Sequence, residues 1–165
     1  MILTKLNALL NYIKNTHTGG NAHMPRNKKG LKDKLWKIFS QYIRLRDAEW
    51  NGNTPCISCG KTMFWKDLDA GHFIAKNSGD FFYFLEDNVH AQCPYCNRFL
   101  HGNLLNYRRR LIDKIGEDKV EELEYQSQLN VRLELNKIDI DYEDLIRVYK
   151  DKLNELKKNK SFERQ

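Results

Sequence analysis

The chain has 165 residues, of which 41% are apolar and 30% are charged, and its formal net charge is +6. This composition is typical of a soluble globular protein that is long enough to bury at least one modest core, and no apolar run approaches the roughly 18 residues of a membrane helix. The first residues also lack the small-residue cleavage site of a signal peptide, so we expect a cytoplasmic protein.

The N-terminal part of the chain predicts two helices with a linker between them. Apolar residues recur at helical spacing from Ile2 to Ile13, and a stretch rich in Gly, Asn and Lys follows up to Gly30. Helical spacing returns from Leu31 to Leu45 and predicts a helix of about four turns. We therefore assign residues 1–30 to an amphipathic helix and a linker.

The centre of the chain has β-strand character. Residues 61–76 and 81–93 are rich in aromatic and β-prone residues, and a turn-forming Asn-Ser-Gly-Asp sequence at 77–80 separates them. These segments predict two short strands or a hairpin with an irregular loop, and the aromatic run at 81–84 is expected to lie in a core strand.

Helical spacing resumes after Cys96. Residues 97–116 predict one helix that ends at Gly116. Its core-facing side chains are expected to be Leu100, Leu104, Leu111, Ile112 and Ile115. Residues 117–128 predict a short acidic helix, and the apolar stripe over 142–156 predicts a C-terminal helix. We therefore assign residues 31–116 to a core unit and residues 117–165 to a C-terminal helical arm.

The four cysteines form two Cys-x-x-Cys pairs, Cys56 with Cys59 and Cys93 with Cys96. Two disulfides are the alternative in an exported protein, but a reduced chain favours a structural zinc ion held by four thiolates. The 33 residues between Cys59 and Cys93 leave room for a hairpin. Zinc would then join the entry of the hairpin to the start of the next helix, which gives an α+β fold built on a ββα unit with flanking α-helices.

Charge is unevenly distributed along the chain. Residues 26–46 contain eight Lys or Arg and one acid, whereas residues 117–144 contain ten acids and three bases. A third basic cluster is formed by Arg108, Arg109 and Arg110. Basic segments that flank a cysteine-rich centre favour a polyanionic partner such as nucleic acid, and a solvated helix face is the alternative.

Side chains suited to metal-assisted phosphodiester hydrolysis are concentrated between the two cysteine pairs and just after them. His72 is expected at or near the end of the first strand, and Asn88 and His90 are expected in the second. Asn97 and His101 are expected four residues apart on one helix face. A neutral imidazole accepts a proton from water near neutral pH. Amide and carboxylate oxygens suit a hard ion such as Mg²⁺, which polarises a phosphate.

The combined pattern CISCG, DAGHF, EDNVHAQCPYCN, GN and YRRRLI followed by IG resembles the NinG (Rap) recombination endonucleases of lambdoid phages. The resemblance covers roughly residues 34–158. The chain is more distantly similar to phage endonuclease VII, which also places an asparagine directly after its last zinc cysteine. Both belong with the HNH, or His-Me finger, nucleases. The resemblance therefore implies a zinc-stabilised ββα-metal core and an endonuclease that cleaves branched recombination intermediates such as Holliday junctions.

The resemblance also implies roles for individual residues. His72 is the expected general base, with Asn97 as a metal ligand and Asn88 as the residue that braces the loop presenting His72. His90 is expected either to orient His72 or to face the metal. Mg²⁺ or Mn²⁺ is the expected catalytic ion. The expected DNA-contacting residues are Lys34, Lys37, Lys76, Arg98, Arg108, Arg109 and Arg110.

The sequence departs from many HNH enzymes just before His72. Those enzymes place a metal-binding Asp or His there, whereas this chain has Gly71 and its nearest acid is Asp69. Asp69 would bind the catalytic metal directly, reach it through water, or brace the loop. His101 would be a metal ligand or contact DNA or solvent, because the NinG family does not generally place a histidine there.

We therefore predict a phage- or prophage-encoded, metal-dependent junction endonuclease that acts in the bacterial cytoplasm. A homodimer is expected, because a four-way junction has two strands to cut and the terminal amphipathic helices need burial. The alternative is a non-enzymatic zinc module that binds DNA through its basic helix. A weaker alternative is a zinc-containing protein-interaction domain.

Overall fold

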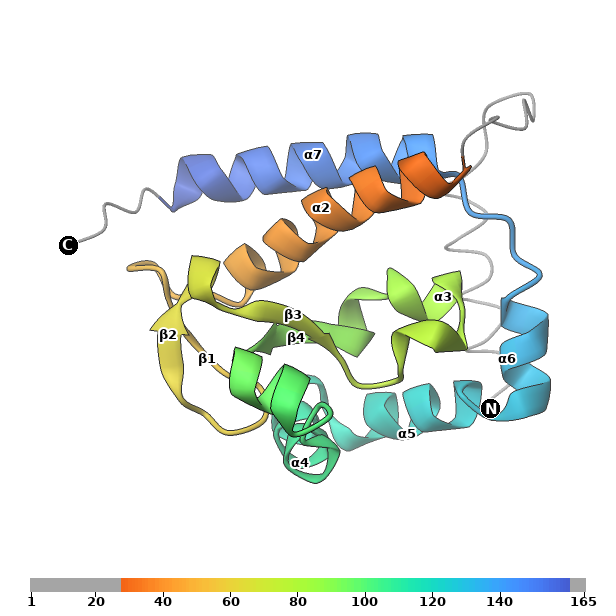
Figure 1. Cartoon of the computed structure of the whole chain (residues 1–165), viewed down its shortest axis with the longest axis horizontal. Helices are drawn as coiled ribbons and strands as arrows, with labels where there is room; N and C mark the ends of the chain where they lie inside the picture. The colour runs from red at the N-terminus through yellow and green to blue at the C-terminus, as the bar shows by residue number, and fades with distance from the viewer. Residues whose placement is uncertain (1–27, 161–165) are drawn as a thin grey trace.

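The computed structural model describes residues 28–160, so the helix expected over 2–13 lies outside the described residues (Figure 1). The two long helices expected at 31–45 and 142–156 are confirmed as α2, Lys28–Arg46, and α7, Tyr142–Asn159. Asp141 caps α7, because its side chain accepts a hydrogen bond of 3.0 Å from the amide of Asp144.

α2 and α7 lie side by side and bury their apolar stripes against each other (Figure 1). Phe39 of α2 meets Tyr149 of α7 edge to face, with ring centroids 4.8 Å apart. The apolar stripe of the C-terminal helix is therefore buried within the chain. This stripe does not need a partner subunit to cover it. The C-terminal helix therefore gives no reason to expect a dimer.

In the described part of the chain, four short strands form two antiparallel pairs. β1, Asn53–Pro55, pairs with β2, Thr62–Phe64, and β3, Asp69–His72, pairs with β4, Val89–Gln92. In the second pair His72 lies opposite Val89 and Gly71 lies opposite His90. Neighbouring residues of a strand point to opposite faces, so His72 and His90 lie on opposite faces of this sheet.

The β3–β4 pair lies between two helical layers. Ala70 and Val89 pack into the core made with α2 and α7. On the other side lie α4, Leu104–Ile115, and α5, Glu117–Gln126. The Tyr107 hydroxyl of α4 donates to the Gly71 carbonyl oxygen over 3.0 Å. The sheet thus holds the residues after Leu68 at the centre of the molecule.

The strand expected at 81–84 is wrong, because the segment enters the short helix α3, Asp80–Tyr83. Phe81, Phe82 and Phe84 are all buried. A strand would alternate these side chains between two faces, whereas the helical turn sends Phe81 and Phe82 to one cluster and Phe84 to the α2–α7 core. Residues 81–84, which do not alternate with polar residues, therefore form a helical turn whose aromatic side chains pack into two different apolar clusters.

The single helix expected over 97–116 is also wrong. A π-helical turn covers Tyr95–Phe99 and α4 begins only at Leu104. Between them His101, Gly102 and Asn103 have positive φ angles of 48°, 90° and 47°, which reverse the chain. Leu100 and Leu104, expected in the core, are 42% and 48% exposed. Leu111 is buried and Gly116 ends α4, as predicted.

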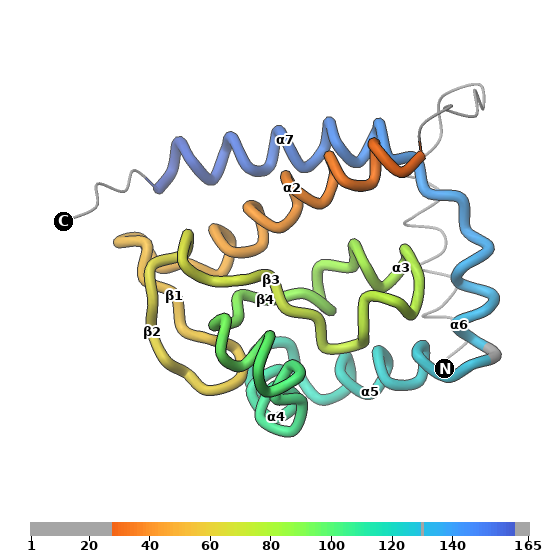
Figure 2. The backbone as a smooth tube through the Cα atoms, viewed as in Figure 1, coloured from red at the N-terminus to blue at the C-terminus, as the bar shows by residue number. Residues whose placement is uncertain are grey.

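The acidic helix expected over 117–128 is confirmed as α5. α6, Leu129–Leu135, is an additional helix whose sequence alternates Leu and Val with polar residues and so lacks helical spacing. Its Leu135 packs against Phe81 and Phe82. From α6 the chain leads into α7, which lies beside α2 (Figure 2). Within residues 28–160, no helix is both long and apolar enough to cross a membrane.

Candidate functional site

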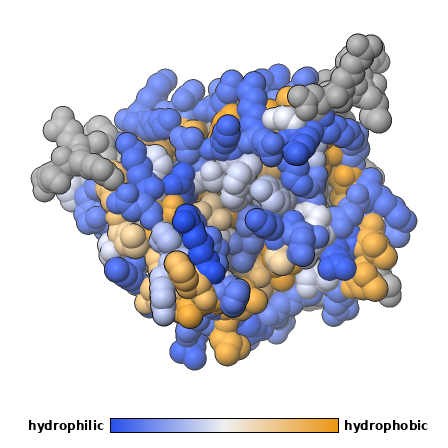
Figure 3. Space-filling model, in the orientation of Figure 1, coloured by the Kyte–Doolittle hydropathy of each residue, from blue (hydrophilic) through white to orange (hydrophobic). Residues whose placement is uncertain are grey.

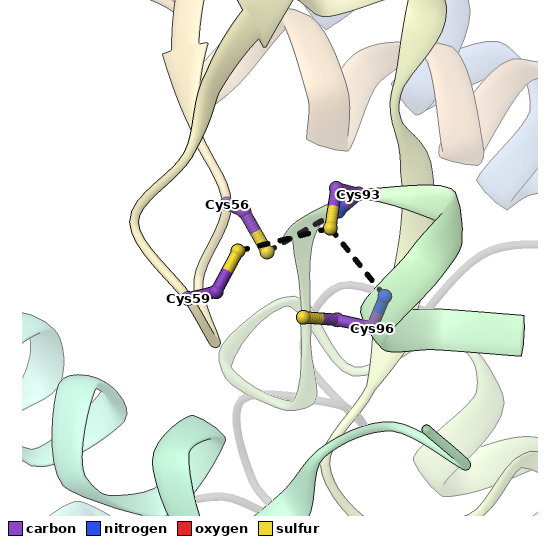
Figure 4. Close-up of side chains that lie close together, drawn as sticks. All are labelled: Cys56, Cys59, Cys93 and Cys96. Carbon is purple, nitrogen blue, oxygen red and sulfur yellow. Dashed lines mark hydrogen bonds between the residues drawn. The ribbon is translucent and has the colours of Figure 1, made fainter. Parts of the chain in front are cut away.

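The four cysteines converge on one point (Figure 4). Cys56 and Cys59 lie between β1 and β2, Cys93 directly follows β4, and Cys96 lies in the π-helical turn. Their sulfur atoms lie within 4.8 Å of one another and none forms a disulfide. A tetrahedral zinc with Zn–S bonds of about 2.3 Å places its sulfurs roughly 3.8 Å apart, which is the Cys59–Cys93 sulfur distance of 3.8 Å.

Hydrogen-bond donors around the cluster also fit thiolate ligands. The Cys93 amide donates to the Cys56 sulfur over 3.2 Å, and the Cys96 amide donates to the Cys93 sulfur over 3.4 Å. Such donors stabilise the negative sulfur of a metal ligand. The four cysteines could therefore hold a zinc ion. Four thiolates leave no open coordination position, so this site suits a structural role.

A pocket of about 640 Å³ lies beside the π-helical turn. Its walls come from α2, from β3 and the loop after it, and from the segment that begins with the π-helical turn. It brings together six of the residues predicted for catalysis, metal binding or DNA binding: Asp69, His72, Lys76, Asn97, Arg98 and His101. Zinc would fix one wall of this pocket, because Asn97 directly follows Cys96.

His72 is held in one orientation by a ring and a carbonyl. Its ring stacks on Trp36 at 5.4 Å between centroids. Its Nε2 lies 3.1 Å from the Tyr83 carbonyl oxygen, so Nε2 must carry a proton and Nδ1 is left as the basic nitrogen. Burial lowers the His72 pKa from 6.5 to about 4. The imidazole is therefore neutral at pH 7 and able to accept a proton.

Asp69 is bound by two neighbours in the π-helical turn. Arg98 donates to both carboxylate oxygens, and the Asn97 amide nitrogen donates to Oδ2 over 3.0 Å. Burial raises the Asp69 pKa, but the hydrogen bonds from Arg98 and Asn97 outweigh it and leave the pKa below its usual value. Because the side-chain nitrogen of Asn97 faces Asp69, the side-chain oxygen of Asn97 remains as an acceptor. The two residues together offer hard oxygen atoms.

His101 reaches the pocket by a different route from the predicted one. It was expected one helical turn after Asn97, but the π-helical turn ends at Phe99 and His101 lies in the following reversal. A positive φ is uncommon for a residue with a side chain and concentrates at functional sites. His101 is exposed and lines the same pocket as Asn97.

Asn88 and His90 lie behind the pocket. The fully buried Asn88 side chain accepts from the Ile74 amide over 2.7 Å and donates to the carbonyl oxygens of Ile74 and Phe82. It thus ties together the two ends of the loop that follows His72. His90 does not line the pocket, because its Nδ1 lies 2.9 Å from Arg46 and its Nε2 lies 3.2 Å from the Asp87 carbonyl oxygen.

Steric crowding explains why the residue before His72 is a glycine, Gly71. A Cβ atom at this position would collide with the side chain of Gln92, which crosses the strand pair beside it. The Gln92 amide in turn donates to Ser58 and to the Gly102 carbonyl oxygen, each over 2.6 Å. The position directly before His72 therefore has no room for a side chain.

The family model described as Bacteriophage Lambda NinG protein matches residues 20–160. The chain belongs to the NinG family. It is 42% identical over 88 residues to Protein ninG of Escherichia phage 933W, and 40% identical over 88 residues to those of Escherichia phage lambda and Salmonella phage P22. These alignments cover 53% of this chain and 41% of each relative, so the chain spans less than half the length of the curated relatives it matches. No solved structure gives a significant match.

The basic residues predicted to contact DNA in this NinG-family chain differ in where they lie. Lys76 and Arg98 line the pocket, whereas Lys34, Lys37, Arg109 and Arg110 are exposed outside it. Arg108 is engaged elsewhere: its guanidinium donates twice to Glu124 of α5, over 2.6 and 2.9 Å. Arg108 is therefore less available to DNA than predicted.

Sequence reasoning missed one wall of the pocket. Trp36, Ser40 and Arg44 line it from α2, and Tyr83 lines it from α3. The three α2 residues recur every four positions, so they share one helix face, and that spacing could have identified them. Arg44 donates to the carbonyl oxygens of Lys66 and Leu68. Together with Lys76 it gives the pocket positive charge beyond the Asp69–Arg98 ion pair, which suits an anion such as phosphate.

Proposed function

We propose that this NinG-family chain is a metal-dependent DNA endonuclease that cleaves branched recombination intermediates such as Holliday junctions. One observation carries the proposal: a neutral His72, fixed by Trp36 and by the Tyr83 carbonyl oxygen, shares a cationic pocket with Asp69 and Asn97. A base, hard oxygen donors and phosphate-binding cations are the components of metal-assisted phosphodiester hydrolysis. The match to the NinG family model and to the phage relatives supports the part of the proposal that places this chain in phage recombination.

His72 supplies the base in this mechanism. Its Nδ1 accepts a proton from a water molecule, and the resulting hydroxide attacks the phosphorus while the bond to the leaving oxygen breaks. The Tyr83 carbonyl oxygen stabilises the imidazolium that forms, because it accepts the Nε2 proton. Arg44 and Lys76 place positive charge where the phosphate oxygens would lie.

Asp69 and the Asn97 carbonyl oxygen are the atoms that would hold the catalytic ion, with His101 as a further candidate. Their hard oxygens fit Mg²⁺ or Mn²⁺. When bound, such an ion stabilises the charge that develops on the phosphate and on the leaving oxygen. Asp69 would have to give up at least part of its ion pair with Arg98, which then becomes able to bind a phosphate.

We further propose that β3, β4 and the π-helical turn with α4 form the ββα-metal core of a His-Me finger nuclease, related to endonuclease VII. Supporting this, two antiparallel strands place His72 on the first strand and lead into a helical segment that carries Asn97. The broken helix is the main departure from the expected unit. Lys34, Lys37, Arg109 and Arg110 would extend DNA contact beyond the pocket. A homodimer in the host cytoplasm remains part of the proposal.

A non-enzymatic zinc module that binds DNA is the second candidate. The exposed basic residues of α2 and α4 favour it, and the stacking of His72 on Trp36 is compatible with a purely structural histidine. The two candidates are separated by incubating the purified protein with a labelled four-way junction and Mg²⁺, beside a linear duplex of the same length. Metal-dependent nicking near the branch that disappears in His72→Ala supports the nuclease. Binding without nicking supports the module.

A further inference from the structure

Five apolar side chains lie unpacked on the surface beside the pocket. Tyr95 and Phe99 of the π-helical turn are 63% and 71% exposed, and Leu105 at the start of α4 is 86% exposed. Leu100 and Leu104 are exposed as well. In Figure 3 hydrophobic atoms gather at the lower front of the molecule, where Figure 1 places α4 and the turn before it. Exposed apolar side chains gathered on one face of a protein often mark an interaction surface.

The patch contains an ordered pair of rings. Tyr95 and Phe99 lie nearly parallel, with their centroids 6.1 Å apart and an angle of 26° between their planes. The Leu100 amide donates to the Tyr95 carbonyl oxygen over 3.1 Å, which closes the π-helical turn that holds the two rings. π-helical turns often mark functional sites. A zinc ion at Cys93 and Cys96 would fix the backbone of this turn at its base.

The same five-residue turn faces the pocket with its other side chains. Asn97 and Arg98 line the pocket, while Tyr95 and Phe99 do not. The two rings therefore belong to the same short turn as two side chains of the pocket. Aromatic rings beside a cationic groove are the arrangement with which proteins hold unpaired bases, because every base has a face that stacks.

From these observations we propose that Tyr95 and Phe99 form a stacking platform for unpaired DNA bases next to the phosphate that enters the pocket. This inference rests on the proposed DNA substrate and goes beyond it, since it assigns recognition of the branch to unstacked bases. Rigid rings lose little conformational freedom on binding, so a preformed pair favours splayed bases over a paired duplex. The leucines at 100, 104 and 105 would border the platform on its apolar side.

Charge argues against a second copy of the chain as the occupant. An isologous contact sets a patch against itself. Arg109 follows Leu105 by one helical turn on the exposed side of α4. A two-fold contact through this patch would bring this arginine close to its own copy, and the repulsion disfavours association. The same positive charge favours a polyanion.

The test measures binding and needs no cleavage. In a His72→Ala background without added Mg²⁺, fluorescence anisotropy gives the affinity for a forked DNA with unpaired arms and for a fully paired duplex of the same length. Replacing both rings, Tyr95→Leu with Phe99→Leu, keeps apolar side chains but removes the stacking faces. We expect the fork affinity to fall roughly tenfold or more and the duplex affinity to change less than about twofold. Trp50→Leu is the control, because Trp50 is 80% exposed and does not line the pocket.

Three results would overturn the platform. The fork affinity could survive the double substitution, the fork and duplex affinities could fall by the same factor, or sedimentation could show that the substitution converts a dimer to monomers. Zinc content and unfolding midpoint verify that each variant is folded. A failure to nick DNA would refute the proposed nuclease and leave this binding result intact, so the two failures are distinguishable.

Discussion

Arg98 holds both oxygens of the Asp69 carboxylate, with Nε 2.8 Å from Oδ2 and Nη2 2.6 Å from Oδ1. The carboxylate that is the proposed metal ligand is thus neutralised by a guanidinium that is itself largely exposed. Any cation that binds Asp69 competes with Arg98 for the same oxygens. In the proposed mechanism this pair would set the balance between the metal-free and the metal-loaded pocket.

Arg98→Ala is therefore expected to bind Mn²⁺ more tightly than the wild type does. Because an exposed ion pair contributes little stabilisation, we expect a gain of roughly two- to fivefold in affinity. Mn²⁺ titration followed by electron paramagnetic resonance, without DNA, measures this directly. Arg109→Ala is the matched control, since Arg109 is also exposed and does not line the pocket. An unchanged or weaker affinity in Arg98→Ala would show that Asp69 does not bind the ion.

His72→Ala is expected to lower the nicking rate by about 10²- to 10⁴-fold, the range for a lost general base. Junction affinity should stay close to the wild-type value, because the positive charges of the pocket remain. Single-turnover cleavage and a binding titration on the same junction separate the two effects. Cleavage at the wild-type rate would refute the proposed base.

The pH dependence follows from the environment of His72. Burial lowers its pKa to about 4, so the neutral base persists below pH 6 and is lost only as the pH falls toward 4. Trp36→Ala removes the ring that covers it and should move the pKa upward toward 6.5. An NMR titration of the His72 ring protons measures both values without relying on activity. A pKa near 6.5 in the wild type would contradict the proposed burial.

Asp47→Asn should destabilise the fold by about 3 kcal/mol, because Arg46 and Lys114 lose the buried carboxylate with which both of them pair. The Asp47 carboxylate is 5% exposed and pairs with Arg46 over 3.0 Å and Lys114 over 2.9 Å. Burial raises its pKa, but His90, Arg46 and Lys114 together hold the pKa far below its usual value. This stabilisation is therefore present above about pH 4, the unfolded carboxyl value, and is lost as the pH falls further.

Urea unfolding of the wild type and Asp47→Asn at several pH values tests this prediction. The difference in unfolding free energy should be largest near pH 7 and should narrow below about pH 4. Asp33→Asn on the exposed side of α2 is the control and should change stability little. A difference that does not vary with pH would show that the charge of Asp47 is not what stabilises the fold.

Zinc removal is expected to unfold the centre of the molecule. The two cysteine pairs join the β1–β2 loop to the π-helical turn, so Cys93→Ser should lose both the bound metal and cooperative unfolding. Metal analysis by mass spectrometry and thermal unfolding measure the two effects. Disulfides without zinc in protein kept anaerobic would refute the site.

The sequence predicted the parts of the fold that depend on local periodicity. The stripes over 31–45 and 142–156 identified α2 and α7, because a long helix with one buried face repeats its apolar residues regularly. Short elements carry no such signal. α3 is a four-residue helix within an aromatic run, and its direction depends on clusters made by distant residues.

In the candidate site, too, features with a local sequence signal could be predicted and features that depend on distant contacts could not. Cysteine spacing predicted the sulfur cluster, and chemical type together with the family resemblance predicted His72, Asp69 and Asn97 as site residues, which line one pocket. The geometry of the helix after Cys96 could not be predicted, because the reversal at 101–103 depends on contacts of the Gly102 carbonyl oxygen with Ser58 and Gln92. The wall that α2 contributes to the pocket could not be predicted either, because it depends on how α2 crosses β3 in the folded chain.

The packing of α7 on α2 determines where the chain can be shortened. Trp36, Ser40 and Arg44 form a wall of the pocket on one side of α2, while Phe39 and Tyr42 on the other side are covered by Tyr149. A truncation at residue 116 would expose these aromatic rings to water and loosen the helix that supports His72. The smallest fragment that retains the pocket must therefore include residues 142–159, although they lie far from the cysteines and the histidine in the sequence.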